Sequence, residues 1–162
     1  MQKNKGFTLI ELLVVIAVLG ILMAAVLAGI DPLQQIKKGR DTSTRSLMVE
    51  YSNALLRYNG IKGIFPWNNV TVATAALTSF NSNTTQDLIN SGELKTNFLQ
   101  AAGANLSKIY LTGDSVNVTL CFQPESKAFR ADPQAMYNNG GVNGAGCPEG
   151  NNANCHICII AR

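Results

Sequence analysis

The residues best suited to chemistry form a short cluster near the C-terminus. Cys155 and Cys158 have a Cys-x-x-Cys spacing and enclose His156, the only histidine of the chain. Such a spacing is typical of a thiol redox site, which usually lies at a helix start near a βαβ unit. Here the pair lies four residues from the C-terminus, outside any such pattern. A thiol oxidoreductase is therefore a distant alternative.

Four cysteines in the last 42 residues offer two other chemistries: Cys121, Cys147, Cys155 and Cys158. Zinc held by Cys155 and Cys158 would use Cys147 and either Cys121 or His156 as further ligands. The spacings of 26, 8 and 3 residues, however, do not form two close ligand pairs. An even number of clustered cysteines favours two structural disulfides in an oxidising compartment, with three possible pairings. We predict that Cys121 joins one of the other three, which would tie the tail to the sheet, and that no metal or cofactor is bound.

Other catalytic patterns are weak. A serine or cysteine triad would have to use His156, and the sequence places no partner beside it. The glycine-rich stretch 140–146 does not lie between a strand and a helix, and no Walker lysine follows it, so we interpret it as a loop. We therefore expect that the chain is not an enzyme.

The charge balance argues against a nucleic-acid partner. The formal net charge is +3, but without Lys3 and Lys5 there are 11 basic side chains against 10 acidic ones, which leaves +1. A general electrostatic attraction to nucleic acid is not supported by this balance. One local cluster of basic residues could contact anionic lipid or DNA, although a solvated helix face is the favoured interpretation: Lys37, Lys38, Arg40 and Arg45.

The N-terminal part contains an apolar run of 24 residues, 7–30, whose only charge is Glu11. As a helix this run is about 36 Å long, enough to cross a hydrocarbon core of about 30 Å. Lys3 and Lys5 favour a cytoplasmic N-terminus and an exported C-terminal part. Residues 26–28 resemble a signal cleavage site, but the run exceeds the roughly 7–15 apolar residues of a cleaved secretory signal. We predict a single membrane-spanning helix.

Glu11 is the unusual residue of this helix, because a carboxylate in an apolar membrane segment normally has a partner or a function. If the chain is cut after Gly6, Phe7 gains a free amino group about 6 Å from Glu11 along the helix axis. That amine could pair with the Glu11 carboxylate of the same chain or of a neighbouring one. A pair between neighbours would fix the axial stagger of the two chains.

The stretch Lys5-Gly6-Phe7-Thr8-Leu9-Ile10-Glu11 resembles the processing signature of type IV prepilins and type II secretion pseudopilins. The resemblance is strong over residues 3 to 58. It implies cleavage after Gly6 by a prepilin peptidase, N-methylation of Phe7 and an assembly role for Glu11. It divides the chain into a leader (1–6), a transmembrane and filament-core helix (7–30) and an amphipathic helix with an extracytoplasmic pilin domain (31–162).

The resemblance also implies a structural function as the subunit of a type IV pilus-like or type II secretion pseudopilus filament. The partners would be copies of the chain or related pilins, the prepilin peptidase, the inner-membrane assembly platform and, before assembly, membrane lipid. The protein would be a single-pass membrane protein that ends in an extracellular filament. The alternative is a membrane-anchored minor pilin that acts as an adhesin or a DNA-uptake binding protein.

Beyond the apolar run we expect an α+β fold in which one long helix packs on an antiparallel sheet of about three strands. Asp31-Pro32 predicts a kink near Ala28, and the helix should continue to about Asn59, where Gly60 stops it. Its apolar stripe should pack on the sheet: Ile36, Leu47, Tyr51, Ala54, Leu55 and Tyr58.

The remaining elements are read from turn and strand signals. Lys108–Thr112 and Ser115–Phe122 flank Gly113-Asp114 and predict a hairpin, and Ala128–Ala131 predicts a third strand. Phe65-Pro66-Trp67 should pin a variable connection, residues 60–106, onto the core. Within this connection we expect a short helix capped by Thr84 or Thr85. Residues 138–154 should form a loop held by disulfides.

Overall fold

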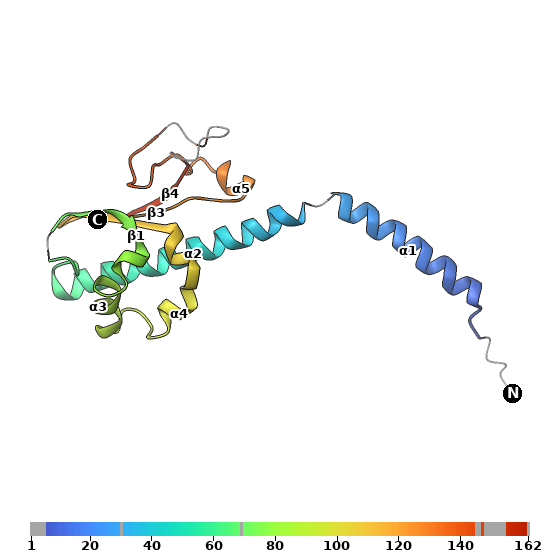
Figure 1. Cartoon of the computed structure of the whole chain (residues 1–162), viewed down its shortest axis with the longest axis horizontal. Coiled ribbons are helices and arrows are strands. Elements are labelled where there is room, and N and C mark those ends of the chain that lie inside the picture. Colours follow the sequence, from blue (N-terminus) through green and yellow to red (C-terminus); the bar gives the residue numbers. More distant parts are fainter. Residues whose placement is uncertain (1–5, 30, 69, 145–146, 148–154, 162) are drawn as a thin grey trace. The chain divides into compact units, whose positions relative to one another are not determined.

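The computed structural model describes residues 6–29, 31–68, 70–144, 147 and 155–161 (Figure 1). The chain divides into two compact units, Met1–Gln35 and Ile36–Arg162, which are taken separately below. Residues 1–5 of the predicted leader lie outside the described residues, as do residues 148–154 of the predicted C-terminal loop.

The first unit contains helix α1, Leu9–Gly29, which lies inside the predicted apolar run. Glu11 in its first turn is the only charged residue, and apolar side chains occupy every face. Its window Leu9–Leu27 has a mean hydropathy of 2.9 and none of it is buried. Among the described residues this is the one helix long and apolar enough to cross a membrane.

Helix α2, Pro32–Lys62, begins as a separate helix. We predicted a kink in a continuous helix; instead α1 ends at Gly29 and α2 has its own N-terminal cap. The Asp31 Oδ1 accepts hydrogen bonds from the backbone N–H groups of Leu33 and Gln34 at 3.1 and 3.2 Å. Proline fits the first helical position because no intrahelical partner exists there for an N–H group. Asp-Pro therefore starts a helix here.

The end of α2 also differs from the prediction. The helix passes through Gly60 and ends at Lys62. Gly63 has a φ of 73°, and its N–H donates to the Asn59 carbonyl at 2.7 Å. A glycine in this left-handed conformation is the usual residue after a helix C-terminus. The helix is therefore terminated by Gly63 and not by the predicted Gly60.

The buried face of α2 includes apolar residues that we predicted and polar residues that we did not. Tyr51, Ala54 and Leu55 are fully buried in the core. Ile36, placed at the start of the predicted stripe, is 54% exposed. Three polar side chains of α2 are nearly as buried as the core: Asp41, Thr44 and Ser52. The helix is therefore fixed by polar contacts as well as by apolar ones.

The sheet has four antiparallel strands in the order β1-β2-β3-β4: Val72–Ala76, Ile109–Gly113, Val118–Phe122 and Ile157–Ala161. The α+β class and the central hairpin are confirmed, and the strand count is four rather than about three. Figure 1 shows the strands on one side of α2 and helices α3 (Thr84–Asn90) and α4 (Phe98–Ala102) on the other. The core of the unit combines side chains of α2, the sheet and these helices.

Two strands, β1 and β4, and one short helix were missed in the sequence analysis. Residues 128–131 do not form a strand, because Lys127–Arg130 is the short helix α5. The Ser126 hydroxyl accepts the Phe129 N–H at 3.3 Å and caps this helix. Strand β1 lies in the predicted variable connection, and β4 lies in the tail that we expected only to be cross-linked.

The predicted apolar anchor at residues 65–67 is confirmed. The ring of Trp67 stacks on that of the buried Phe65, with centroids 4.8 Å apart. The Trp67 Nε1–H donates to the Asp114 carbonyl in the hairpin turn at 2.9 Å. A Cβ at Gly113 would lie 2.8 Å from the Trp67 ring, so glycine permits this close approach. The anchor thus connects the end of α2 to the β2–β3 turn.

Short helices complete the unit: α3 (Thr84–Asn90), α4 (Phe98–Ala102) and the 3₁₀ segments Leu77–Phe80 and Gly103–Lys108. The predicted helix near Thr84 is confirmed, but its cap position is Asn83. The Thr85 hydroxyl instead shares a hydrogen bond of 2.9 Å with the buried Tyr51 hydroxyl of α2. This bond satisfies two polar groups inside the core.

Candidate functional site

The start of α1 is fixed by a reciprocal pair of hydrogen bonds between Thr8 and Glu11. The Thr8 backbone N–H and hydroxyl donate to the Glu11 Oε2 at 2.9 and 2.7 Å. In return, the Glu11 N–H donates to the Thr8 hydroxyl oxygen at 3.3 Å. This arrangement is a capping box, with threonine at the cap position and glutamate three residues later. The Glu11 carboxylate is therefore held at the helix N-terminus.

The capping box separates the helix from the predicted cleavage position. Gly6, Phe7 and Thr8 are not helical, and α1 begins at Leu9. Phe7 is 80% exposed. The peptide bond between Gly6 and Phe7 thus lies in exposed, non-helical chain just before a capped helix. This geometry leaves the bond open to an enzyme that binds an extended substrate.

Sequence reasoning identified Gly6, Phe7 and Glu11 but gave Thr8 no role. The signal was present, since a threonine followed three residues later by glutamate before an apolar run indicates a capping box. The structure adds that the anion of Glu11 lies at the positive end of the helix dipole. Thr8 is therefore the residue that orients the predicted assembly carboxylate.

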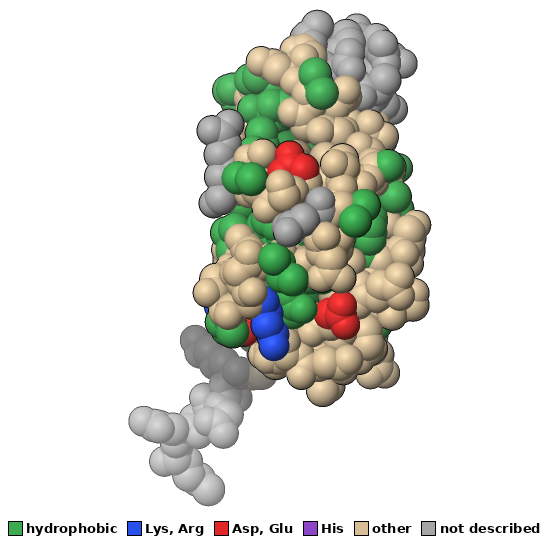
Figure 2. Space-filling model, turned by 90° about the vertical axis from the view of Figure 1, so that its left-hand side faces the viewer, with side chains coloured by type: hydrophobic (Ala, Val, Ile, Leu, Met, Phe, Trp, Pro, Cys, Tyr) green, Lys and Arg blue, Asp and Glu red, His purple; other side chains and the backbone are tan. Residues whose placement is uncertain are grey.

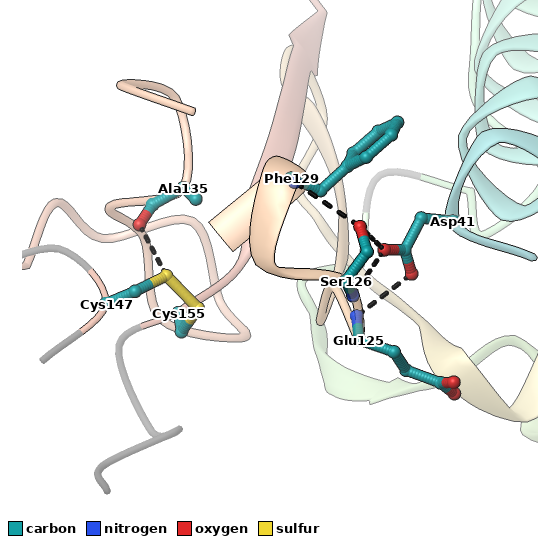
Figure 3. Close-up of a disulfide and its surroundings, with 7 residues drawn as sticks. All are labelled: Asp41, Glu125, Ser126, Phe129, Ala135, Cys147 and Cys155. Carbon is teal, nitrogen blue, oxygen red and sulfur yellow. Dashed lines mark hydrogen bonds between the residues drawn. A yellow bond between two sulfur atoms is a disulfide. The ribbon is translucent and has the colours of Figure 1, made fainter. Parts of the chain in front are cut away.

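The cysteines form two disulfides, Cys121–Cys158 and Cys147–Cys155. The first joins directly paired residues of β3 and β4, in agreement with the expected tie between tail and sheet. The second is drawn in Figure 3, where the Cys147 sulfur lies 3.2 Å from the Ala135 carbonyl oxygen.

The pairing rejects the thiol redox interpretation, because the two cysteines of the Cys-x-x-Cys spacing are bonded to different partners. His156 between them is buried, and its backbone exchanges hydrogen bonds of 2.9 and 3.1 Å with Tyr137. Burial lowers the pKa of His156, which favours the neutral ring. No cluster of three metal-ligating side chains occurs within the described part of the chain.

Asp41 of α2 forms a buried polar contact between this helix and the C-terminal part of the unit (Figure 3). Its carboxylate accepts the backbone N–H groups of Glu125 and Ser126 at 2.9 and 2.8 Å and the Ser126 hydroxyl at 2.6 Å. Ser126 in turn caps α5 through Phe129. No local sequence signal predicts this contact, because its partners are 84 and 85 residues away.

Comparisons with known proteins agree with the geometry of the N-terminus. Residues 1–27 match the family model described as the prokaryotic N-terminal methylation motif. In this N-terminal motif the chain is similar to type IV pilins. It is also 35% identical over 75 residues to fimbrial protein EcpC of Eikenella corrodens.

The similarity to this fimbrial relative is partial. The aligned part is 46% of the pilin-like chain and 48% of the relative, so the chain matches about half of that protein's length. No solved structure matches the chain. The N-terminal motif and the α+β fold with a long apolar helix are therefore the features that connect it to pilins.

Proposed function

We propose that the protein is the structural subunit of a type IV pilus-like filament, with no catalytic turnover of its own. In this proposal the chain is cut after Gly6, methylated on Phe7 and assembled through α1. The observation that carries it is an exposed helix that is apolar apart from one carboxylate, which is fixed at its first turn. The fimbrial relative favours a pilus over a secretion pseudopilus.

The charge arrangement gives Glu11 a specific partner. Both hydrogen bonds that its carboxylate accepts within the described residues end on Oε2, which leaves Oε1 able to accept a further donor. Cleavage after Gly6 creates an ammonium group on Phe7, one residue before the capping threonine. Away from water, an ammonium and a carboxylate attract strongly, and each is costly to bury alone. A pair between neighbouring subunits would set their axial register.

Helix α1 occupies two environments, one after the other. Before assembly, α1 lies in the membrane with the globular unit on the exported side, and the prepilin peptidase and assembly platform act on this form. After assembly, copies of α1 form the filament core and replace lipid as the cover of their apolar side chains. The globular units then face solvent on an extracellular fibre.

Mass spectrometry of the mature N-terminus tests the processing step. We expect protein from cells that contain a prepilin peptidase to begin at Phe7 and to carry one methyl group. A Gly6→Val variant should keep residues 1–6, whereas a Gly20→Val variant, changed inside α1, should be processed normally. Mature protein that begins at Met1, or after Ala28, would contradict the proposal.

Electron microscopy tests the filament role. Cells that make this chain and the assembly apparatus should display fibres that react with antibody to the globular unit along their length. Labelling confined to fibre tips would instead indicate the minor, adhesive or DNA-binding pilin that the sequence left as the alternative.

A further inference from the structure

A pocket of about 430 Å³ lies within the globular unit, between the start of α2, the beginning of β2 and the turn before α5. Its lining combines three cations with one carboxylate and two hydroxyl groups: Lys37, Lys108, Arg130, Glu125, Ser107 and Tyr110. The formal charge of these side chains is therefore positive. In contrast, the face of the molecule in Figure 2 is mainly uncharged, with scattered charged side chains.

The carboxylate of this pocket is already engaged. Glu125 binds the Lys108 Nζ at 2.6 Å through Oε1 and lies 3.8 Å from an Arg40 nitrogen through Oε2. The hydrogen bond from Lys108 holds the pKa of the Glu125 carboxyl below its usual value, and the charges of Arg40 and Lys37 act in the same direction. The nearby Asp41 carboxylate is buried and accepts three hydrogen bonds from residues 125–126. Three cations, Lys108, Arg40 and Lys37, thus act on the single carboxylate of Glu125, which leaves a positive surplus at the pocket.

The backbone beneath the pocket is held in place. Asp41 fixes the backbone of Glu125, and Glu125 fixes the Lys108 ammonium. Lys37 is partly buried in the wall, whereas its neighbour Lys38 is exposed and does not line the pocket. Lys108, which is held before a ligand arrives, therefore loses less entropy when an anion binds beside it. The fixed Glu125 backbone and Lys108 ammonium distinguish the pocket from a basic surface whose side chains are unconstrained.

The position of Lys37 in the chain indicates which anion the pocket can reach. Seven residues separate it from Gly29, the last residue of the apolar helix α1. Ile36, beside it on α2, is 54% exposed, and apolar side chains next to lysines are typical of segments at a membrane surface. The polar headgroup layer of a bilayer is about 5–8 Å thick on each side and contains phosphates. Ammonium and guanidinium groups bind phosphate through charge-assisted hydrogen bonds.

We infer that this pocket binds a phosphate group, and that before filament assembly its ligand is the phosphate of an anionic membrane lipid. The second part rests on the proposed membrane insertion of α1, whereas the first part does not. The headgroup would contact Lys37, with the Lys108–Glu125 pair as one wall. The pocket would then hold the globular unit at the membrane surface until the subunit leaves the bilayer.

Lysine labelling of the full chain in nanodiscs tests this inference. Nanodiscs of phosphatidylcholine are compared with nanodiscs that also contain phosphatidylglycerol, and each is treated briefly with an acetylating reagent. A further arm adds inorganic phosphate to the phosphatidylcholine nanodiscs, with chloride at equal ionic strength as its control. Mass spectrometry then gives the labelling rate of each lysine.

We expect both phosphatidylglycerol and inorganic phosphate to slow labelling of Lys37 and Lys108 relative to Lys38. Lys37→Gln should raise the phosphate concentration that protects Lys108 about tenfold. Lys38→Gln, which makes the same charge change outside the pocket, should alter it by less than about twofold.

Protection by phosphate without protection by phosphatidylglycerol would keep the phosphate site and overturn the lipid as its source. Equal protection of all three lysines by phosphatidylglycerol, with no effect of phosphate, would show surface attraction alone and overturn the pocket. Absence of protection in both arms would do the same. Co-purification of the chain with nanodiscs reports membrane insertion separately, so a failure of the proposed function is distinguishable from a failure of the pocket.

Discussion

The apolar side chains of α1 and those of the globular unit have different surroundings. Along Leu9–Leu27 none of the helix is buried, although its mean hydropathy is 2.9. In the globular unit, large side chains such as Tyr51, Phe65 and Leu120 are fully buried by their own chain. The globular unit therefore supplies its own core, whereas α1 depends on lipid or on other subunits for cover.

The polar contacts differ in the same way. In α1, the hydrogen bonds of the Glu11 side chain to described residues all end on Thr8, one helical turn away. In the globular unit, Asp41 and the Cys121–Cys158 disulfide connect segments far apart in sequence. Substitutions in α1 should therefore change assembly and leave folding intact. Substitutions of the long-range contacts should change the stability of the globular unit.

The largest expected effect is on assembly. Glu11→Gln removes the charge but keeps a side chain that can complete the capping box with Thr8. We expect at least about a tenfold loss of sedimentable filaments, because the Phe7 ammonium would lose its partner. Membrane insertion and thermal unfolding of the globular unit should match those of the parent.

Thr8→Ala is the matched control for Glu11→Gln, since it removes the capping box and keeps the charge. It should reduce filaments less than Glu11→Gln does. Normal filaments from the Glu11→Gln protein would remove the assigned role of the carboxylate and, with it, the contrast between the two regions.

The next effect is on the two disulfides. In the chain-entropy description, a cross-link between Cys121 and Cys158, 37 residues apart, contributes about 4 kcal/mol to the free energy of unfolding. The bond between Cys147 and Cys155, 8 residues apart, contributes about 2.6 kcal/mol. Urea unfolding of the two double Cys→Ala variants should show this order. An equal loss, or the reverse order, would contradict it.

Asp41→Ala should cost about 3 kcal/mol of unfolding free energy, because it leaves two backbone N–H groups and a buried hydroxyl without their acceptor. Asp114→Ala is the matched control. Its carboxylate accepts the Val116 and Asn117 N–H groups in an exposed turn, where water can replace it. If the urea midpoints of the Asp41→Ala and Asp114→Ala variants differ little, the buried contact contributes no more to the free energy of unfolding than the exposed one.

The smallest expected effect is a pH dependence from His156. Burial lowers its pKa in the folded chain below the ordinary 6.5, so the unfolded chain binds more protons below that pH. The free energy of unfolding should therefore fall as pH drops from about 7.5 to about 5.5. His156→Gln should flatten the profile in this range, since the chain has no other histidine. An unchanged slope in the variant would exclude His156 as the cause.

Local signals predicted the parts of the fold that depend on neighbours in sequence. Gly113-Asp114 predicted the hairpin because its turn is closed by hydrogen bonds within residues 114–117. The uninterrupted apolar run predicted α1. Thr8 was overlooked although its three-residue spacing to Glu11 carried the information.

Features that depend on distant partners were not predictable. Residues 128–131 contain apolar side chains typical of a strand. The segment is helical instead, because the Ser126 hydroxyl caps it and Asp41 holds the Ser126 backbone. Strand β4 is short and follows a cysteine-containing stretch, and all five of its residues pair with β3. The cationic pocket likewise gathers residues from positions 37 to 130, a juxtaposition that no spacing in the sequence reports.

The absence of a polar face on α1 has a kinetic consequence for polymerisation. A helix with one apolar stripe can bury that stripe by pairing with a second copy, whereas α1 is apolar on every side. Two copies side by side still leave most of each helix uncovered, and only a ring of neighbours encloses one. The first few subunits to leave the bilayer together should therefore form an unstable nucleus, and later additions should be fast. Fibre growth from purified components should show a lag that short fibre seeds abolish.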